Sequence, residues 1–157
     1  SNPFVSFDRG WFLLTSGSFA TGQFNCMTIS WGSMGTLWNK PVVMVVVRPT
    51  RYTFSFMENH PDFSLCAFAP EYRRALQLLG RRSGRDGNKL AQTTLTPVSA
   101  DQIQSPVYAE ANLILECRKI YSDDLNPDRF LDPSILGNYP SRDFHRMYIG
   151  EVLQIKG

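Results

Sequence analysis

Short apolar segments of strand length recur along the chain. Residues 42–47 read Val-Val-Met-Val-Val-Val, which is too short and too rich in β-branched side chains to favour a helix. Residues 107–120 alternate between apolar and polar side chains, a pattern typical of a long strand with one buried face. The same reasoning predicts six strands in all, at residues 11–15, 25–31, 42–47, 62–68, 107–120 and 144–155.

Two short helices are predicted between these strands. Thr50 is placed to cap the first helix, which runs through Arg51 to Met57 and is stopped by Asn59, His60 and Pro61. Pro70 favours the first turn of the second helix, and Gly80 is a natural stop for it. The remaining connections are predicted as loops, at residues 16–22, 32–41, 97–106 and 123–139.

The succession of elements indicates a single domain made mainly of strands. Six strands, two short helices and no regular alternation of strand and helix argue for a closed or nearly closed antiparallel barrel. Gly150, inside the last strand, indicates a bulge or a close approach of another segment. A length of 157 residues fits one domain, residues 1–157, with a core of its own.

Composition and charge narrow the class of protein. Hydrophobic residues make up 43% and aromatic residues 13%, as in a globular protein, and the net charge of +2 is too small to argue for nucleic acid or an anionic membrane. No apolar run approaches the roughly 20 residues of a membrane span, and no leader of signal type is visible, so we expect a cytoplasmic protein. Cys26, Cys66 and Cys117 are widely spaced, which indicates neither a disulfide framework nor a zinc site.

Basic residues gather where an anion could bind. Arg48 and Arg51 flank the start of the first predicted helix, and a helix N-terminus presents free N–H groups and a partial positive charge. A later glycine-rich basic loop offers further phosphate contacts through Ser83, Arg85 and Lys89. These residues predict an anion site. The alternative is that the arginines and the loop are simply solvated.

The second predicted strand presents small polar side chains on one face. Met27 and Ile29 would point to one side of the sheet. Cys26, Thr28 and Ser30 would point to the other side, where they leave room for a flat group against the backbone. The alternative is an ordinary sheet face with its hydroxyl groups in water.

Six motifs, taken in this order, carry a family resemblance. They are NCMTISW (25–31), LWNKP (37–41), RPTRYT (48–53), SGRD (83–86) with Lys89, LECR (115–118) and HRMYIGEV (145–152). Through them the chain resembles the flavin reductase-like, FMN-binding split-barrel family, and most closely its flavoredoxin-like branch. The resemblance implies a mainly β fold, a six-stranded antiparallel split β-barrel with flanking short helices. Proteins similar to this family are homodimers in which the flavin lies close to the subunit interface.

The resemblance also implies a noncovalent FMN site. The isoalloxazine would lie against residues 25–31, with the ribityl chain and phosphate toward residues 48–53 and the basic loop. His145 would lie on the nicotinamide side of the flavin, and the alternative for it is a histidine that ends a strand. The candidate cofactor-binding residues are Asn25, Cys26, Met27, Thr28, Ile29, Ser30, Trp31, Arg48, Thr50, Arg51, Tyr52, Thr53, Ser83, Gly84, Arg85 and Lys89.

The function implied by the resemblance is that of an NAD(P)H-dependent flavin reductase. In this reading a hydride passes from the nicotinamide to FMN, and no metal takes part. The chain has no Gly-x-Gly-x-x-Gly fingerprint from which to choose between NADH and NADPH. The main alternative is a flavoredoxin-type electron-transfer protein whose tightly bound FMN is reduced by a partner protein. An oxidase of the pyridoxamine phosphate type and a pure binding module are further alternatives.

Overall fold

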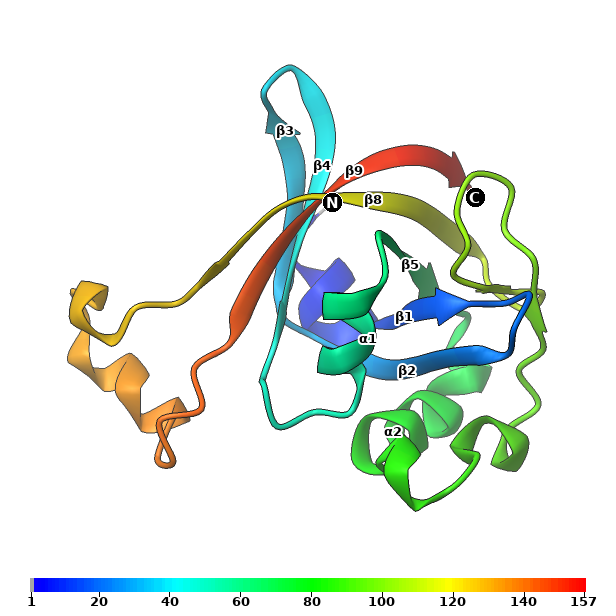
Figure 1. Ribbon diagram of the computed structural model, residues 1–157, viewed down its shortest axis with the longest axis horizontal. Helices are drawn as coiled ribbons and strands as arrows, with labels where there is room; N and C mark the ends of the chain where they lie inside the picture. Colours follow the sequence, from blue (N-terminus) through cyan, green and yellow to red (C-terminus); the bar gives the residue numbers. More distant parts are fainter. Residues whose placement is uncertain (1) are drawn as a thin grey trace.

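The computed structural model describes residues 2–157, and its main feature is one antiparallel sheet (Figure 1). Seven strands pair in the order β2-β1-β5-β8-β9-β4-β3, and β6 and β7 form a separate ribbon of two strands. The strands are β1 Phe12–Ser18, β2 Gln23–Ile29, β3 Gly32–Leu37, β4 Lys40–Val47, β5 Asp62–Ala67, β6 Pro97–Val98, β7 Val107–Tyr108, β8 Leu113–Asp124 and β9 Arg146–Lys156.

Two α-helices and several helical turns connect the strands. In Figure 1, α2 lies beside β2, while α1 lies in front of the sheet near β1 and β2. The α-helices are α1 Thr53–Asn59 and α2 Arg73–Arg81. The shorter segments are the π-helix η1 Ser6–Gly10 and the 3₁₀ helices η2 Pro70–Tyr72, η3 Gly84–Asp86, η4 Lys89–Gln92, η5 Pro127–Arg129 and η6 Pro133–Asn138.

The sheet curls so that strands from both of its edges share one core. Met27 of β2 and Val45 of β4 belong to the same buried cluster, although their strands lie near opposite edges of the sheet. Phe63 of β5 and Tyr148 of β9 fill the space between them and are fully buried. The predicted class, a mainly β split barrel with short flanking helices, is therefore confirmed.

A second core lies between the outer face of the sheet and α2. Leu76 and Leu79 of α2 pack with Leu13 of β1, Cys66 of β5 and Tyr108 of β7, and all five side chains are buried. Burial of this apolar surface holds the helix on the sheet. This packing fixes the C-terminal end of α2 beside β2.

The number of strands differs from the prediction, since residues 2–157 contain nine strands instead of six. β3 lies within the predicted loop at 32–41 and pairs with β4 through a two-residue turn. The turn residues Trp38 and Asn39 have φ of 54° and 56°, the backbone of a type I′ hairpin. Tryptophan is not a turn signal, which is why the sequence pattern did not reveal this hairpin. The predicted strand at 107–120 is divided into β7 and β8.

The segment at 97–106 is not the surface linker that the sequence predicted. Two buried carboxylates hold its backbone. Glu116, which is 1% exposed, accepts hydrogen bonds from the backbone N–H of Asp101. Asp62, which is 6% exposed, accepts hydrogen bonds from the backbone N–H and the hydroxyl of Ser105. The polar face of β8 is thus covered at Glu116 rather than solvated.

The start of α1 also differs from the prediction. The helix begins at Thr53 with Tyr52 before it, and no side chain caps it, so Thr50 is not an N-cap. The reason is a turn that precedes the helix, in which the N–H of Arg51 donates to the carbonyl of Arg48 at 3.0 Å. The helix N-terminus is therefore displaced from the pair of arginines.

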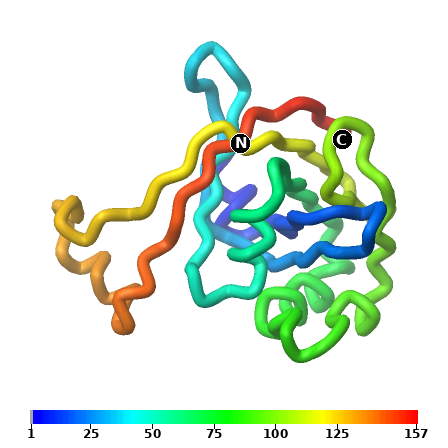
Figure 2. The backbone as a smooth tube through the Cα atoms, in the orientation of Figure 1, coloured from blue at the N-terminus to red at the C-terminus, as the bar shows by residue number. Residues whose placement is uncertain are grey.

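The β8–β9 pair extends beyond the body of the barrel. Figure 2 shows both strands running to an arm, drawn from yellow to orange, that carries η5 and η6. Leu131 in this arm is 98% exposed. The prediction of a turn-rich surface segment at 123–139 is correct from Leu125 onward, since β8 itself continues to Asp124.

Gly150 marks the closest approach inside the barrel, so we expect Gly150→Ala to be destabilising. A Cβ at this position would lie 2.5 Å from Phe63 Cζ, and Phe63 has no room to move. Overpacking of this kind costs about 1–3 kcal/mol in the free energy of unfolding. Urea unfolding of the variant measures the loss, with Gly35→Ala as the control because nothing lies within 4 Å of that position. Equal stability of the two variants would contradict the close approach.

Candidate functional site

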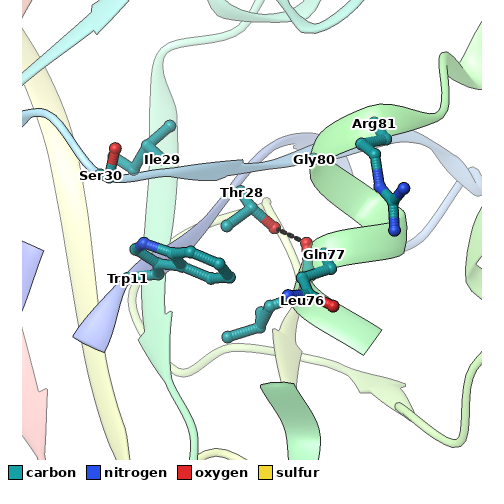
Figure 3. Close-up of a pocket in the computed structure, with 8 residues that line it drawn as sticks. All are labelled: Trp11, Thr28, Ile29, Ser30, Leu76, Gln77, Gly80 and Arg81. Atoms are coloured by element: carbon teal, nitrogen blue, oxygen red, sulfur yellow. Dashed lines mark hydrogen bonds between the residues drawn. The ribbon is translucent and has the colours of Figure 1, made fainter. Parts of the chain in front are cut away.

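A cavity of about 480 Å³ lies between β2 and α2 (Figure 3). Thr28 donates a hydrogen bond to the carbonyl of Leu76 across the strand and helix. A Cβ at Gly80 would lie 3.2 Å from Thr28 Cβ, so the helix approaches the strand closely here. The volume falls in the range of about 300–1,000 Å³ that is typical of small-molecule sites. The lining residues are Trp11, Thr28, Ile29, Ser30, Leu76, Gln77, Gly80 and Arg81.

Trp11 forms an aromatic wall of this first cavity. Its backbone has φ 63° and ψ 153°, a conformation that residues other than glycine rarely adopt. The guanidinium of Arg73 lies 3.1 Å from the centroid of the indole and also donates to the carbonyl of Arg9. The indole is thus held from outside the cavity. Trp11 was not predicted as a site residue from the sequence, because nothing in its spacing links it to the β2 residues.

A second cavity, of about 420 Å³, lies nearer the start of β2. Asn25 Nδ2 donates to Thr53 Oγ1 at 2.8 Å, which joins β2 to α1. Gly84 packs against this pair, since a Cβ there would lie 2.2 Å from Asn25 Oδ1 and 2.8 Å from Tyr52 Cδ2. Of the predicted cofactor-binding residues, this cavity is lined by Asn25, Cys26, Tyr52, Gly84 and Lys89.

Two cations lie next to these cavities and hold the C-terminal end of α2. Lys89 Nζ donates to the carbonyls of Leu79 and Arg82, both at 3.0 Å, and Arg51 Nη2 donates to the carbonyl of Gly80 at 3.1 Å. The last carbonyls of a helix lack partners within the helix and carry partial negative charge, so both cations are well placed.

Neither of these cations is neutralised. Among residues 2–157 no carboxylate forms an ion pair with Arg51 or Lys89. Burial lowers the pKa of Arg51, and burial together with the nearby Arg51 charge lowers the pKa of Lys89. Both directions mean that each charge is incompletely compensated. An anion at the second cavity would therefore be stabilised.

The basic loop is tied to the segment that follows β4. Arg85 Nη1 donates to the carbonyl of Thr50 at 3.2 Å, and its guanidinium lies 5.1 Å from the centroid of the Tyr52 ring. Ser83 Oγ accepts a hydrogen bond from the N–H of Arg85 and so begins η3. Thr50 takes part only through its backbone, since its side chain is exposed. The structure thus brings the two predicted phosphate-binding segments together.

Arg48 does not join this group. Its Nη1 pairs with Asp143 at 3.1 Å, its Nη2 donates to the carbonyl of Asn138 at 2.9 Å, and its guanidinium lies over the ring of Tyr139 at 4.7 Å. The two arginines that the sequence placed together therefore point to different parts of the molecule. Arg48 belongs to the base of the β8–β9 arm.

His145 lies in the same region as Arg48, just before β9. It is 7% exposed, its Nδ1 lies 2.7 Å from the hydroxyl of Tyr139, and its ring centroid lies 5.4 Å from that of Trp31. Burial, and then the charge of Arg48, lower the pKa of His145 to about 4. His145 is therefore a neutral imidazole at pH 7. Tyr139 was not selected from the sequence, although the aromatic density of the arm around it was a signal.

The remaining candidates on β2 point in two directions. Met27 and Ile29 are 6% exposed and belong to the barrel core, so a ligand could reach Met27 only through its backbone. Cys26 packs in the second core, where burial raises its pKa to about 11 and keeps it an unreactive thiol. Trp31 follows β2 and is 49% exposed.

In residues 2–157 no cluster of side chains suits a metal ion, and no helix is long and apolar enough to span a membrane.

The structure is thus a mainly β split barrel with two cavities beside β2, each of a volume typical of small-molecule sites. Residues 4–157 match the model of the flavin reductase like domain, and the chain belongs to this family. Membership supports a flavin-related redox function. No curated protein matches the chain.

Solved structures share the fold at low sequence identity. The flavoredoxin of Desulfovibrio vulgaris (Miyazaki F) has a TM-score of 0.71 and 20% identity, over 93% of this chain and 68% of that one. The flavoredoxin from Methanosarcina acetivorans has a TM-score of 0.70 and 20% identity, over 94% and 68%. A Streptomyces globisporus NADH:FAD oxidoreductase, solved with NAD and FAD fragments, has a TM-score of 0.70 and 18% identity, over 94% and 73%.

The lowered pKa of His145 predicts a pH dependence of stability. In the unfolded chain histidine binds a proton near pH 6.5, whereas in the folded chain His145 binds one only near pH 4. The unfolded state thus binds more protons between these values, and the free energy of unfolding falls as the pH is lowered through this window. Urea unfolding at pH 6.5 and 4.5 should show a larger loss for the native sequence than for His145→Gln. Parallel losses would contradict the buried neutral imidazole.

Proposed function

We propose that this chain is an FMN-binding redox protein and acts as an NAD(P)H-dependent flavin reductase. The observation that carries the proposal is the unneutralised pair Arg51 and Lys89 at the end of α2, of which Lys89 also lines the second cavity. Family membership supports a flavin rather than another phosphorylated ligand. The NADH:FAD oxidoreductase with the same fold supports a nicotinamide as the electron donor.

The first cavity suits the planar part of a flavin. Trp11, Ile29 and Leu76 give it apolar walls, and Ser30 and Gln77 add polar groups. A mostly apolar cavity with a few polar groups is the usual lining of a cofactor site. The backbone of β2 next to this cavity would supply the hydrogen bonds that orient the ring.

The second cavity suits the phosphate end. Asn25, Tyr52 and Lys89 line it, and Gly84 lies so close to Asn25 and Tyr52 that a side chain there would clash with them. A phosphate placed there would compensate the charges of Arg51 and Lys89, and each charge-assisted hydrogen bond contributes about 1.5–3 kcal/mol. The proposed phosphate end also includes Thr53, Ser83 and Arg85. The proposed ring end also includes Thr28, Ser30 and Trp31.

The protein residues bind and orient, and bound FMN supplies the hydride and electron-transfer chemistry. His145 is neutral at pH 7, so it acts as a hydrogen-bonding group on the nicotinamide side and not as a proton donor. Cys26 stays protonated and takes no part in catalysis. The protein therefore needs no nucleophilic side chain of its own.

A homodimer is part of the proposal. The β3–β4 hairpin exposes Met34, Leu37 and Trp38, at 48%, 42% and 53%, and Ile155 of β9, which is 66% exposed, lines one hollow together with Met34. A contiguous apolar surface of this kind usually marks an interface. Sedimentation analysis should give twice the mass of the chain, and Met34→Glu should shift the protein toward the monomer. If the native protein sediments as a monomer both at high concentration and after 100-fold dilution, the dimer would be contradicted.

A second candidate is a flavoredoxin-type electron carrier with permanently bound FMN and a partner protein as donor. The observation that favours it is the likeness of the fold to two flavoredoxins. The two candidates differ in the electron donor. Only the flavin reductase would be reduced directly by a nicotinamide.

Anaerobic reduction of the FMN-loaded protein tests the proposed function. We expect flavin absorbance that bleaches on addition of NADH or NADPH, because the proposed reductase takes its hydride directly from a nicotinamide. The faster of the two nucleotides identifies the donor. Bleaching by dithionite alone would favour the electron carrier, and failure to take up FMN would contradict both candidates.

The Arg51→Ala substitution tests the phosphate placement. We expect FMN affinity to fall by about 1.5–3 kcal/mol, since one charged contact to the phosphate is lost. Fluorescence titration of FMN measures the affinity, with Arg74→Ala as the control because Arg74 is an exposed arginine on α2, the helix whose end Arg51 contacts. Circular dichroism shows whether α2 keeps its structure. Unchanged FMN affinity in a folded Arg51→Ala variant would contradict the placement.

A further inference from the structure

Tyr139 and His145 form a buried hydrogen-bonded pair at the base of the β8–β9 arm. The Tyr139 hydroxyl and His145 Nδ1 are 2.7 Å apart, and the two residues are 5% and 7% exposed. A neutral imidazole has one N–H donor and one acceptor nitrogen. Within residues 2–157 the Tyr139 hydroxyl has no other hydrogen-bond acceptor, so it donates to Nδ1. The proton of the imidazole is then on Nε2.

The position of Tyr139 is itself fixed by its surroundings. Its ring packs against Phe144 at a centroid distance of 4.7 Å, and Arg48 lies over it at the same distance. Arg48 in turn pairs with Asp143 and donates to the carbonyl of Asn138. Because Asn138 precedes Tyr139 and Asp143 follows it, the guanidinium ties both sides of the tyrosine to the end of β4. Arg48 therefore acts through Tyr139 and not on a phosphate.

The other nitrogen of His145 is free and accessible. Within residues 2–157 Nε2 has no hydrogen-bond partner, and no buried polar side-chain atom is left without one. Nε2 must therefore reach the surface. The neighbouring indole of Trp31 is 49% exposed, at a centroid distance of 5.4 Å from the imidazole. The result is a single N–H donor presented beside an exposed aromatic side chain.

We propose that Tyr139 is a positioning residue that fixes His145 in its Nε2–H tautomer, so that this N–H donates to the carboxamide oxygen of the nicotinamide. This inference rests on the proposed function and deepens it. The carboxamide oxygen is an acceptor, so the opposite tautomer would face it with a lone pair. Trp31 offers a flat surface on which the planar ring of the nicotinamide can rest.

Nitrogen NMR of the imidazole rings tests the tautomer directly. The chain has only two histidines, His60 and His145, and His145→Gln assigns their signals. We expect His145 in the flavin-free protein to show a proton bonded to Nε2 and none on Nδ1. In Tyr139→Phe the chemical shifts of Nδ1 and Nε2 should move toward each other, because the two tautomers then exchange. Tyr121→Phe, in the same arm, should leave both chemical shifts unchanged. An Nδ1-bonded proton in the native sequence would overturn the inference.

Kinetics of the FMN-loaded protein separate positioning from a merely structural role. Loss of one oriented hydrogen bond should raise the KM for the preferred nicotinamide about 3- to 10-fold in Tyr139→Phe, with kcat and the FMN dissociation constant nearly unchanged. Because Tyr139 acts through His145, the same substitution in a His145→Gln background should change KM by less than about 2-fold.

Different failures identify different errors. Additive effects of the two substitutions, or an unchanged KM in Tyr139→Phe, would overturn the role of Tyr139 while leaving the FMN site intact. A fall in FMN affinity in Tyr139→Phe would show that Tyr139 supports the fold of the whole site. That result would also overturn its role as a positioning residue for His145. A native protein that binds no FMN would overturn the proposed function and this inference together.

Discussion

The site depends on how the C-terminal end of α2 is satisfied. Its last carbonyls lie beside β2, and Lys89 and Arg51 donate to three of them from outside the helix. Lys89 comes from the loop after α2 and Arg51 from the turn before α1, so three separate segments meet at one point. Because a carbonyl carries only a partial charge, each cation keeps most of its own. The structure thus joins its segments with charges that a bound phosphate would compensate.

The same arrangement divides the basic residues between two tasks. Arg51, Arg85 and Lys89 gather around the end of α2, while Arg48 turns to the β8–β9 arm and fixes Tyr139. The division occurs at the turn between β4 and α1, since Arg48 and Arg51 lie at its two ends and contact different segments. One end of the proposed flavin site is therefore cationic, and the other ends in a neutral histidine.

The sequence was sufficient for the fold class and for the family resemblance, because strand periodicity and short motifs are local properties. It predicted the strands at the centre of the sheet, and it selected Asn25, Arg51 and Lys89, which the fold brings to one place. It missed β3, whose turn uses Trp38 and Asn39 with positive φ instead of a glycine. It did not select Trp11 or Tyr139, and it did not show that Arg48 lies over Tyr139, since these contacts are set by packing between segments far apart in the chain.

The central claim, that unneutralised cations at the end of α2 hold the phosphate of the cofactor, is tested most directly by comparing FMN with riboflavin. The two differ only in the phosphate, and both can be titrated by fluorescence under the same conditions. Two charge-assisted hydrogen bonds of about 1.5 kcal/mol or more each correspond to a preference for FMN of at least roughly 100-fold. That preference should shrink as salt is added. Equal affinity for the two flavins would contradict the account.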